Sequence, residues 1–125
     1  MDNRDIGKLG EDLACEYLVK NGYKILGRNC RIKFGEIDII AKKRDAFGEI
    51  IHFIEVKALQ GRTLQCFYPE EHVNYKKRRK LARLAEIWLS DNKLPYNSSY
   101  QIDIVAVSIN GESPEINYFE NTIKG

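Results

Sequence analysis

The spacing of apolar residues divides the chain into two helical and several extended segments. From residue 5 to residue 21 the apolar positions recur every three or four residues, which predicts a helix that ends before Gly22. The same spacing predicts a second helix from residue 73 to residue 90. Strands are predicted at residues 23–32, 35–42, 50–58 and 100–109, with a short edge strand at 116–119.

The order of these elements is helix, three strands, helix, strand and a final short strand. The strands at 35–42 and 50–58 are joined by a polar turn and therefore form an antiparallel hairpin. The strand at 100–109 follows a crossover helix, which favours parallel pairing. We expect an α/β fold in which helices flank a mixed sheet of four to five strands. The length of 125 residues indicates one domain over residues 1–125.

Charged residues interrupt both strands of the predicted hairpin. Folding the chain about the centre of the turn at residues 44–49 places Asp38 opposite Glu55 and Glu36 opposite Lys57. Alternation along a strand then brings Glu55 and Lys57 to one face, beside Asp38. Two neighbouring carboxylates repel each other unless a cation lies between them, so we expect a divalent metal there. Glu36 shares the face of Asp38 and is expected to support the metal ligands. A solvated face with weak ion pairs is the alternative.

A further carboxylate, Glu11, lies in the first predicted helix close to Gly7 and Gly10. Each glycine weakens a helix by about 1 kcal/mol relative to alanine, and such glycines often allow a strand or a ligand to approach closely. Gly7 stands four residues before Glu11, so the space beside Glu11 on that face is open. We expect Glu11 to reach the metal site. The alternative is a surface glutamate beside glycines that pack the helix.

The second helix carries a run of basic residues although the net charge of the chain is only +2. One stripe at helical spacing consists of Lys76, Arg79, Lys80 and Arg83. Localised positive charge of this kind predicts contacts with the phosphates of a nucleic acid, and a solvated face is the alternative. The loop after the strand at 50–58 adds Gln60 and Arg62 as candidate substrate contacts.

Other function classes find less support in the sequence. No apolar run approaches the roughly 20 residues of a membrane span, and the first residues are polar, so we expect a cytoplasmic protein. The cysteines form no zinc pattern, and neither a Ser-His-Asp set nor a phosphate-binding Gly-rich loop is evident. His52 is expected to face out of its strand. Asp103 is expected to form a hydrogen bond at a strand end.

The resemblance to a known family rests on four segments in this order: Gly7-x-x-Gly10-Glu11, Arg28-Asn29, residues 35–41 and Glu55-Val56-Lys57. Together they resemble the YraN-type family of uncharacterised bacterial proteins, and the match spans almost the whole chain, with Lys76 and the strand around Asp103 included. The resemblance implies a restriction-endonuclease-like fold. That fold is shared with archaeal Holliday-junction resolvases, which this chain resembles in the order helix glutamate, Asp, Glu-x-Lys.

The resemblance also implies a phosphodiesterase site that depends on Mg²⁺ or Mn²⁺. Asp38 and Glu55 would bind the metal, and Glu11 would bind it directly or through a water molecule. Lys57 would orient the attacking water and stabilise the charged phosphorane. The chain departs from the family pattern at Leu59, because members often have an arginine two residues after the motif lysine. Gln60 or Arg62 would compensate for this change.

Three functions are left open by the sequence. The first is a metal-dependent endonuclease that cuts DNA, branched or damaged DNA in particular; the resolvase resemblance alone suggests a homodimer, since two cuts need two sites. The second is a nucleic-acid-binding module of the same fold that does not cleave. The third is a protein-interaction domain whose carboxylates form a structural ion network. The choice between DNA and RNA is not settled by the sequence.

Overall fold

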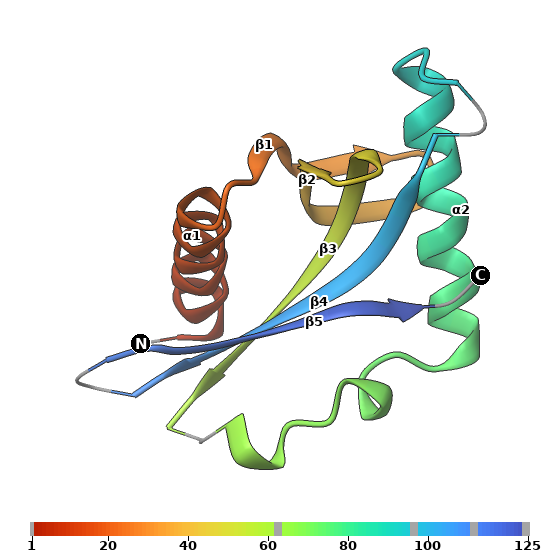
Figure 1. Ribbon diagram of the computed structural model, residues 1–125. Helices are drawn as coiled ribbons and strands as arrows, with labels where there is room; N and C mark the ends of the chain where they lie inside the picture. The colour runs from red at the N-terminus through yellow and green to blue at the C-terminus, as the bar shows by residue number, and fades with distance from the viewer. Residues whose placement is uncertain (1, 62–63, 96–97, 111–112, 124–125) are drawn as a thin grey trace.

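A mixed sheet with a long helix on each side forms the body of the structure (Figure 1). The computed structural model describes residues 2–61, 64–95, 98–110 and 113–123. The elements in chain order are α1 (Asn3–Lys20), β1 (Lys24–Ile32), β2 (Gly35–Asp45), β3 (Gly48–Gln60), η1 (Leu64–Cys66), η2 (Pro69–Glu71), α2 (Tyr75–Asp91), β4 (Tyr100–Ile109) and β5 (Glu115–Ile123). The predicted order of helices and strands is confirmed.

The five strands lie in the order β1-β2-β3-β4-β5. Strands β3 and β4, which α2 connects, are parallel, as the crossover argument predicted, and the other neighbours are antiparallel. The predicted edge strand at 116–119 is longer in the structure, where it extends as β5 from Glu115 to Ile123. Polar residues on both sides of the apolar stretch concealed its length, because an edge strand can expose alternate side chains to solvent.

Helix α1 begins where the sequence supplies a cap. The Asp2 side chain accepts a hydrogen bond of 2.9 Å from the backbone N–H of Asp5, which satisfies a free donor of the first turn. The residues that α1 buries follow one another at intervals of four: Ile6, Gly10, Ala14 and Leu18. After the last turn the chain reverses at Gly22, whose φ of +89° is readily adopted only by glycine.

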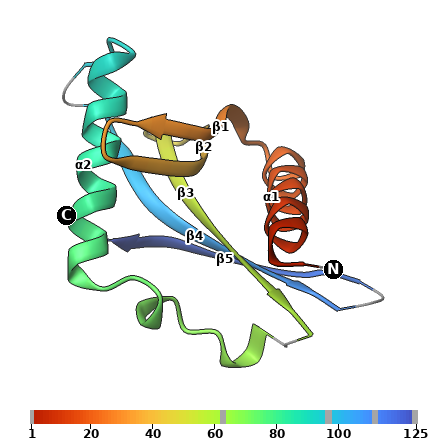
Figure 2. The same ribbon diagram turned by 180° about the vertical axis from the view of Figure 1, so that it is seen from behind.

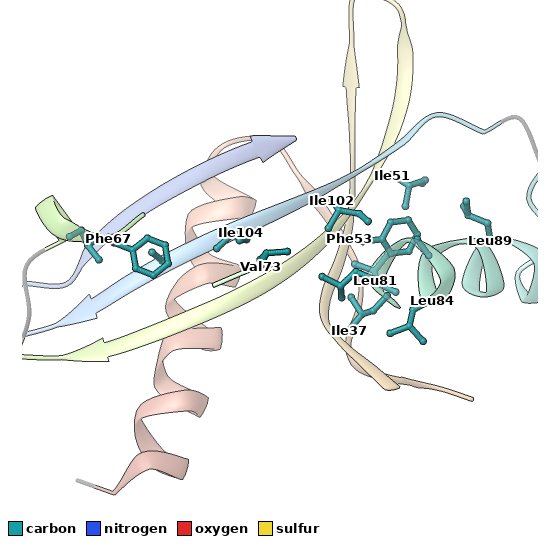
Figure 3. Close-up of a cluster of buried hydrophobic side chains, with 14 residues drawn as sticks. Ile37, Ile51, Phe53, Phe67, Val73, Leu81, Leu84, Leu89, Ile102 and Ile104 are labelled. Atoms are coloured by element: carbon teal, nitrogen blue, oxygen red, sulfur yellow. The ribbon is translucent and has the colours of Figure 1, made fainter. Parts of the chain in front are cut away.

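The central strands separate two apolar cores, because successive side chains point to opposite faces of a sheet. Ile104 belongs to the core beside α2, and its neighbour Val105 belongs to the core beside α1. Helix α2 contributes Leu81, Leu84, Ala85 and Leu89 to the first of these cores. Figure 3 shows Leu81 and Leu84 near Ile37. Burial on both faces explains why the apolar runs in these strands are nearly continuous.

The expectation that His52 faces outward is wrong. His52 is only 3% exposed, and its Nδ1 lies 2.6 Å from Oδ2 of Asp103. Asp103 does form hydrogen bonds, as expected, but it lies inside β4 rather than at a strand end, and it also accepts the hydroxyl hydrogen of Tyr118. Alternation of polar and apolar residues did not indicate exposure here because this face of the sheet is also covered.

Among residues 2–61, 64–95, 98–110 and 113–123, no helix is both long and apolar enough to cross a bilayer. Each of the two helices buries one face against the sheet.

Candidate functional site

Strands β2 and β3 stop pairing at the point where the predicted site begins. Their paired residues end with Ile39 opposite Ile54, which is the register expected from the turn. In that register the next pair is Asp38 and Glu55. The Asp38 side chain accepts a hydrogen bond of 2.9 Å from the backbone N–H of Val56. The carboxylate of Asp38 therefore connects the two strands where their ladder ends.

Asp38 is half-buried, and its surroundings favour the protonated form. Burial raises the pKa of the Asp38 carboxyl, and the negative charges of Glu55 and Glu36 raise it further. The hydrogen bond from Val56 and the ammonium of Lys57 act in the opposite direction. A cation at this carboxylate would offset both the burial and the repulsion, since it stabilises the ionised form.

Glu55 has one carboxylate oxygen with two cations and one without a hydrogen-bond partner. Oε1 lies 2.5 Å from Nζ of Lys77 and 3.5 Å from Nζ of Lys57. Oε2 is buried and has no hydrogen-bond partner, and the side chain as a whole is only 15% exposed. A buried carboxylate oxygen left in this state costs free energy, so it is a candidate for a ligand contact.

Asp38, Glu55 and Glu36 line a small cavity between β2, β3 and α2. Its volume is about 30 Å³, and Phe53 and Leu81 contribute apolar walls. A polar cavity needs roughly 10–15 Å³ to hold one water molecule, so this one admits a ligand of about that size. The two residues predicted to bind a metal therefore line the same partly enclosed space.

Helix α1 brings Glu11 toward this region through a close contact with β3. A Cβ atom added at Gly10 would lie 2.6 Å from Cβ of Ala58, whereas one added at Gly7 would meet nothing within 4 Å. Gly10 thus allows the helix to lie against the strand, and Gly7 leaves open space. The predicted close approach is confirmed for Gly10, and the open space predicted beside Gly7 is confirmed as well.

Glu11 shares a cation of β1 with Asp12, whose Oδ1 lies 2.7 Å from Nη2 of Arg28. Nη2 of Arg28 lies 3.8 Å from Oε1 of Glu11, and that oxygen has no hydrogen-bond partner. Burial raises the pKa of the Glu11 carboxyl, the charge of Asp38 raises it further, and Arg28 together with a hydrogen bond from Asn29 lowers it. Glu11 therefore lies close enough to Asp38 for the two carboxylates to repel each other.

The residues present fit a metal held by two carboxylates better than one held by three. In the part of the chain that the structure describes, no three His, Cys, Asp or Glu side chains are grouped closely enough to hold a metal ion. Mg²⁺ is commonly bound through one or two carboxylates and several water molecules. Asp38 and the free Oε2 of Glu55 supply such a pair, and Glu11 would then act through water.

Sequence reasoning missed Lys77. The predicted basic stripe used the outward positions of the helix, but Lys77 precedes Leu81 by four residues and Leu84 by seven. It therefore lies on the face of α2 that packs on the sheet, which is how it reaches Glu55. Extending the apolar stripe of the helix by one turn toward its N-terminus would have identified Lys77 as a residue that faces the sheet.

The predicted basic stripe lies together on the surface of α2. The basic hollow, as we call it, has a volume of about 830 Å³. It is lined by two aromatic rings, Phe34 and Tyr75, by the four cations Lys76, Arg79, Lys80 and Arg83, and by Ala82 and one carboxylate, Glu86. One of its cations reaches the strand that carries Glu36 and Asp38, because Cε of Lys80 lies 3.0 Å from the position of a Cβ atom on Gly35, the residue before Glu36. Gln60 is exposed at the end of β3, and Arg62 lies outside the described residues.

The sequence of the chain places it in a family. A model of the uncharacterised protein family UPF0102 matches residues 10–107. The chain belongs to this family. The matched range includes Glu11, Asp38, Glu55 and Lys57 as well as the whole basic stripe. The resemblance to the YraN-type family seen in the sequence is thus confirmed.

Similar UPF0102 proteins cover almost the full length of the chain. The UPF0102 protein of Caldicellulosiruptor saccharolyticus is 42% identical over 97% of this chain and 98% of its own length. That of Dictyoglomus turgidum is 36% identical over 94% of each chain, and that of Clostridium kluyveri is 44% identical over 86% of this chain and 83% of its own.

Two solved structures show a distant likeness to this UPF0102 chain. A repair endonuclease from Pyrococcus abyssi is similar over 90% of this chain and 41% of that chain, with 12% identity and a TM-score of 0.41. Pyrococcus furiosus SfsA in complex with Ca²⁺ is similar over 99% of this chain and 66% of that chain, with 17% identity and a TM-score of 0.39.

Proposed function

We propose that this UPF0102 protein is a metal-dependent endonuclease that hydrolyses phosphodiester bonds in DNA, with branched or damaged DNA as the substrate that the resolvase resemblance favours. Two observations carry the proposal: Oε2 of Glu55 is buried without a hydrogen-bond partner, and Glu55 and Asp38 line the same small cavity. Two carboxylates around a space of water size are suited to a divalent cation, and a lysine beside them is suited to a phosphate.

The proposed roles of the residues are those that the family resemblance implies. Asp38 and Glu55 would hold Mg²⁺ or Mn²⁺, and Glu11 would support the ion through a water molecule. When bound, the metal supplies Lewis acidity and lowers the pKa of a coordinated water. Lys57, whose ammonium lies 3.5 Å from Glu55, orients the attacking water and neutralises charge that develops on the phosphate. Glu36 adds negative charge at the edge of the cavity.

The substrate lies across the basic hollow in this proposal. Lys76, Arg79, Lys80 and Arg83 contact phosphates, and Gln60 and Arg62 contact the nucleic acid beyond Lys57. Each phosphate contact releases a counterion, so binding should weaken steeply with salt. A homodimer would supply the two active sites that two cuts require.

Cleavage of linear, flapped and four-way DNA with Mg²⁺ or Mn²⁺ tests the proposal. Glu55→Gln and Lys57→Ala should each abolish metal-dependent cutting. Glu49→Gln is the matched control, because Glu49 lies on the same strand, exposed and paired with Lys42 at 3.2 Å. Cutting that persists in Glu55→Gln, or that does not need a metal, would contradict the proposal.

A non-cleaving nucleic-acid-binding module is the second candidate, and the Lys77–Glu55 ion pair favours it. An ammonium 2.5 Å from Glu55 neutralises this carboxylate without a metal. This candidate predicts salt-sensitive binding that metal does not change and that Glu55→Gln leaves intact. Nucleic-acid binding curves measured with EDTA and with Mn²⁺, for the wild type and for Glu55→Gln, separate the endonuclease from the non-cleaving module.

A further inference from the structure

Two exposed aromatic rings line the basic hollow. The side chains of Phe34 and Tyr75 are 56% and 74% exposed, whereas most large apolar side chains of this protein are buried. Phe34 lies between β1 and β2, and Tyr75 is the first residue of α2, so segments distant in the sequence bring them to one surface. Exposed apolar groups gathered at one place typically mark a binding surface.

Each ring is accompanied by a cation of the same hollow. The guanidinium of Arg83 lies 5.7 Å from the ring centroid of Phe34, and that of Arg79 lies 5.8 Å from the ring centroid of Tyr75. Lys76 and Lys80 line the same surface. The hollow therefore offers two apolar rings and four cations, with the single carboxylate of Glu86 beside them, within reach of one extended ligand.

This combination distinguishes between forms of nucleic acid. A continuous duplex presents phosphates to a basic surface but keeps the faces of its bases stacked inside. A single strand presents both phosphates and base faces, and aromatic side chains with cations along a groove are the usual means of binding it. Duplex binding alone would use the four cations and would leave the two rings without a partner.

Residues that are neighbours in the chain line the hollow and the carboxylate cavity. Phe34 and Glu36 flank Gly35, which lies against Lys80 and Leu84 of α2. Lys80 faces the hollow, and the next residue, Leu81, lines the cavity. In Figures 1 and 2 the end of the β1–β2 hairpin lies beside α2 in both views. A strand bound in the hollow would thus lie next to the carboxylates.

We propose that the basic hollow binds an unpaired strand of the substrate and stacks its bases on Phe34 and Tyr75. The protein then acts beside a single-stranded segment, such as a flap or an opened branch, rather than within a continuous duplex. Only the position of the cut rests on the proposed endonuclease function. The preference for an unpaired strand concerns binding and is testable without cleavage.

Fluorescence anisotropy in EDTA, with the full chain, tests the preference. The probes are an oligo-dT strand of about 16 nucleotides and a blunt DNA duplex of the same length. Tyr75→Ala and Phe34→Ala should each weaken binding of the single strand about tenfold and leave duplex binding nearly unchanged. Tyr75→Phe should retain single-strand binding, because it keeps the ring. Tyr68→Ala is the control, since Tyr68 is also exposed but lies outside the hollow.

The salt dependence separates stacking from charge. Neither Tyr75→Ala nor Phe34→Ala removes a charge, so the slope of log K against log salt should stay the same while K falls. Lys76→Ala removes one phosphate contact and should reduce that slope by about 0.7 on a single strand. Equal losses on both probes, or no loss on either, would overturn the stacking proposal.

Different results would contradict the endonuclease function and the single-strand binding surface. A wild-type protein that prefers single strands through Tyr75 but never cuts DNA would overturn the endonuclease function and support the binding surface. A protein that cuts a continuous duplex as well as a flap, with no effect of Tyr75→Ala on single-strand affinity, would overturn the binding surface alone. Both substituted side chains are largely exposed, and circular dichroism verifies that the variants are folded.

Discussion

The ammonium of Lys77 lies 2.5 Å from Oε1 of Glu55, which links helix α2 to strand β3 by an ion pair at the edge of a partly enclosed cavity. The ammonium of Lys57 approaches the same oxygen at 3.5 Å. Two cations thus share one oxygen of the carboxylate, and the other oxygen has no hydrogen-bond partner. A divalent cation at this position would meet both the attraction of Glu55 and the repulsion of the two lysines.

Replacing Lys77 by methionine should strengthen metal binding. The substitution Lys77→Met keeps the aliphatic part of the side chain and removes a positive charge beside Glu55, so repulsion of the metal decreases. We expect the dissociation constant for Mn²⁺ to fall about tenfold, which corresponds to about 1.4 kcal/mol. Calorimetric titration with Mn²⁺ measures it. Lys76→Met is the control, and unchanged or weaker Mn²⁺ binding in Lys77→Met would contradict the expected repulsion.

The stability of the metal-free protein should depend on the charge of Asp38. Burial and the neighbouring carboxylates raise the pKa of Asp38 above its ordinary value of 3.8 in the folded state. The folded protein therefore binds this proton more tightly than the unfolded chain does, and stability falls as pH rises from 3.8 through the raised pKa. Above this pH range the full cost of the ionised Asp38 reduces the stability, and below it the protonated Asp38 carries no such cost.

The substitution Asp38→Asn removes this penalty and keeps an oxygen that can accept the N–H of Val56. We expect a higher melting temperature than wild type at about pH 7.5 in EDTA, and a difference that shrinks as the pH approaches about 4. Thermal unfolding across this pH range measures the effect. A variant that is less stable than wild type at neutral pH would show that the charge of Asp38 stabilises the fold.

The two glycines of α1 should respond in opposite ways to alanine. Gly10→Ala places a Cβ atom 2.6 Å from that of Ala58, which forces the helix away from β3. We expect a loss of about 1–3 kcal/mol in the free energy of unfolding, as for other overpacked cores. Gly7→Ala meets nothing within 4 Å and should gain about 0.5–1 kcal/mol through helix propensity. Urea unfolding measures both, and a neutral Gly10→Ala would refute the close packing.

Metal-induced stabilisation should separate these two glycine variants further. Gly10 positions Glu11 relative to β3, so a displaced helix should reduce the increase in melting temperature that Mn²⁺ causes. Gly7→Ala adds a methyl group in open space and should leave that increase unchanged. Equal Mn²⁺ responses in the two variants would indicate that Glu11 takes no part in holding the metal.

The buried hydrogen bonds around Asp103 should support the fold and not the site. Burial and the negative charge of Asp103 raise the pKa of Tyr118, which keeps its hydroxyl protonated as a donor. Tyr118→Phe leaves Asp103 with one donor fewer and should cost about 1–3 kcal/mol of stability. DNA binding below the melting temperature should be unchanged. Tyr75→Phe, at an exposed hydroxyl, is the control for the stability measurement.

Local patterns in the sequence determined the elements and the register of the hairpin. Asp45 pairs with Gly48 around a tight turn, and Phe47 donates its backbone N–H to the Asp45 side chain at 2.7 Å. A short connection between two strands leaves little freedom in how they align, so Asp38 could be placed beside Glu55 from the sequence alone. The helices were equally predictable, because their apolar spacing and their caps are local properties.

Tertiary structure alone decided which distant side chains meet. His52 and Asp103 are buried as a pair because α1 covers a face of the sheet that the strand pattern could not reveal. Lys77 reaches Glu55, and Phe34 joins Tyr75, only because α2 lies across β3 and beside the β1–β2 hairpin. The sequence determined the carboxylates and their strands, since period and turn are local. The packing of the helices determined which cations and other side chains surround these carboxylates, since such contacts join segments far apart in the chain.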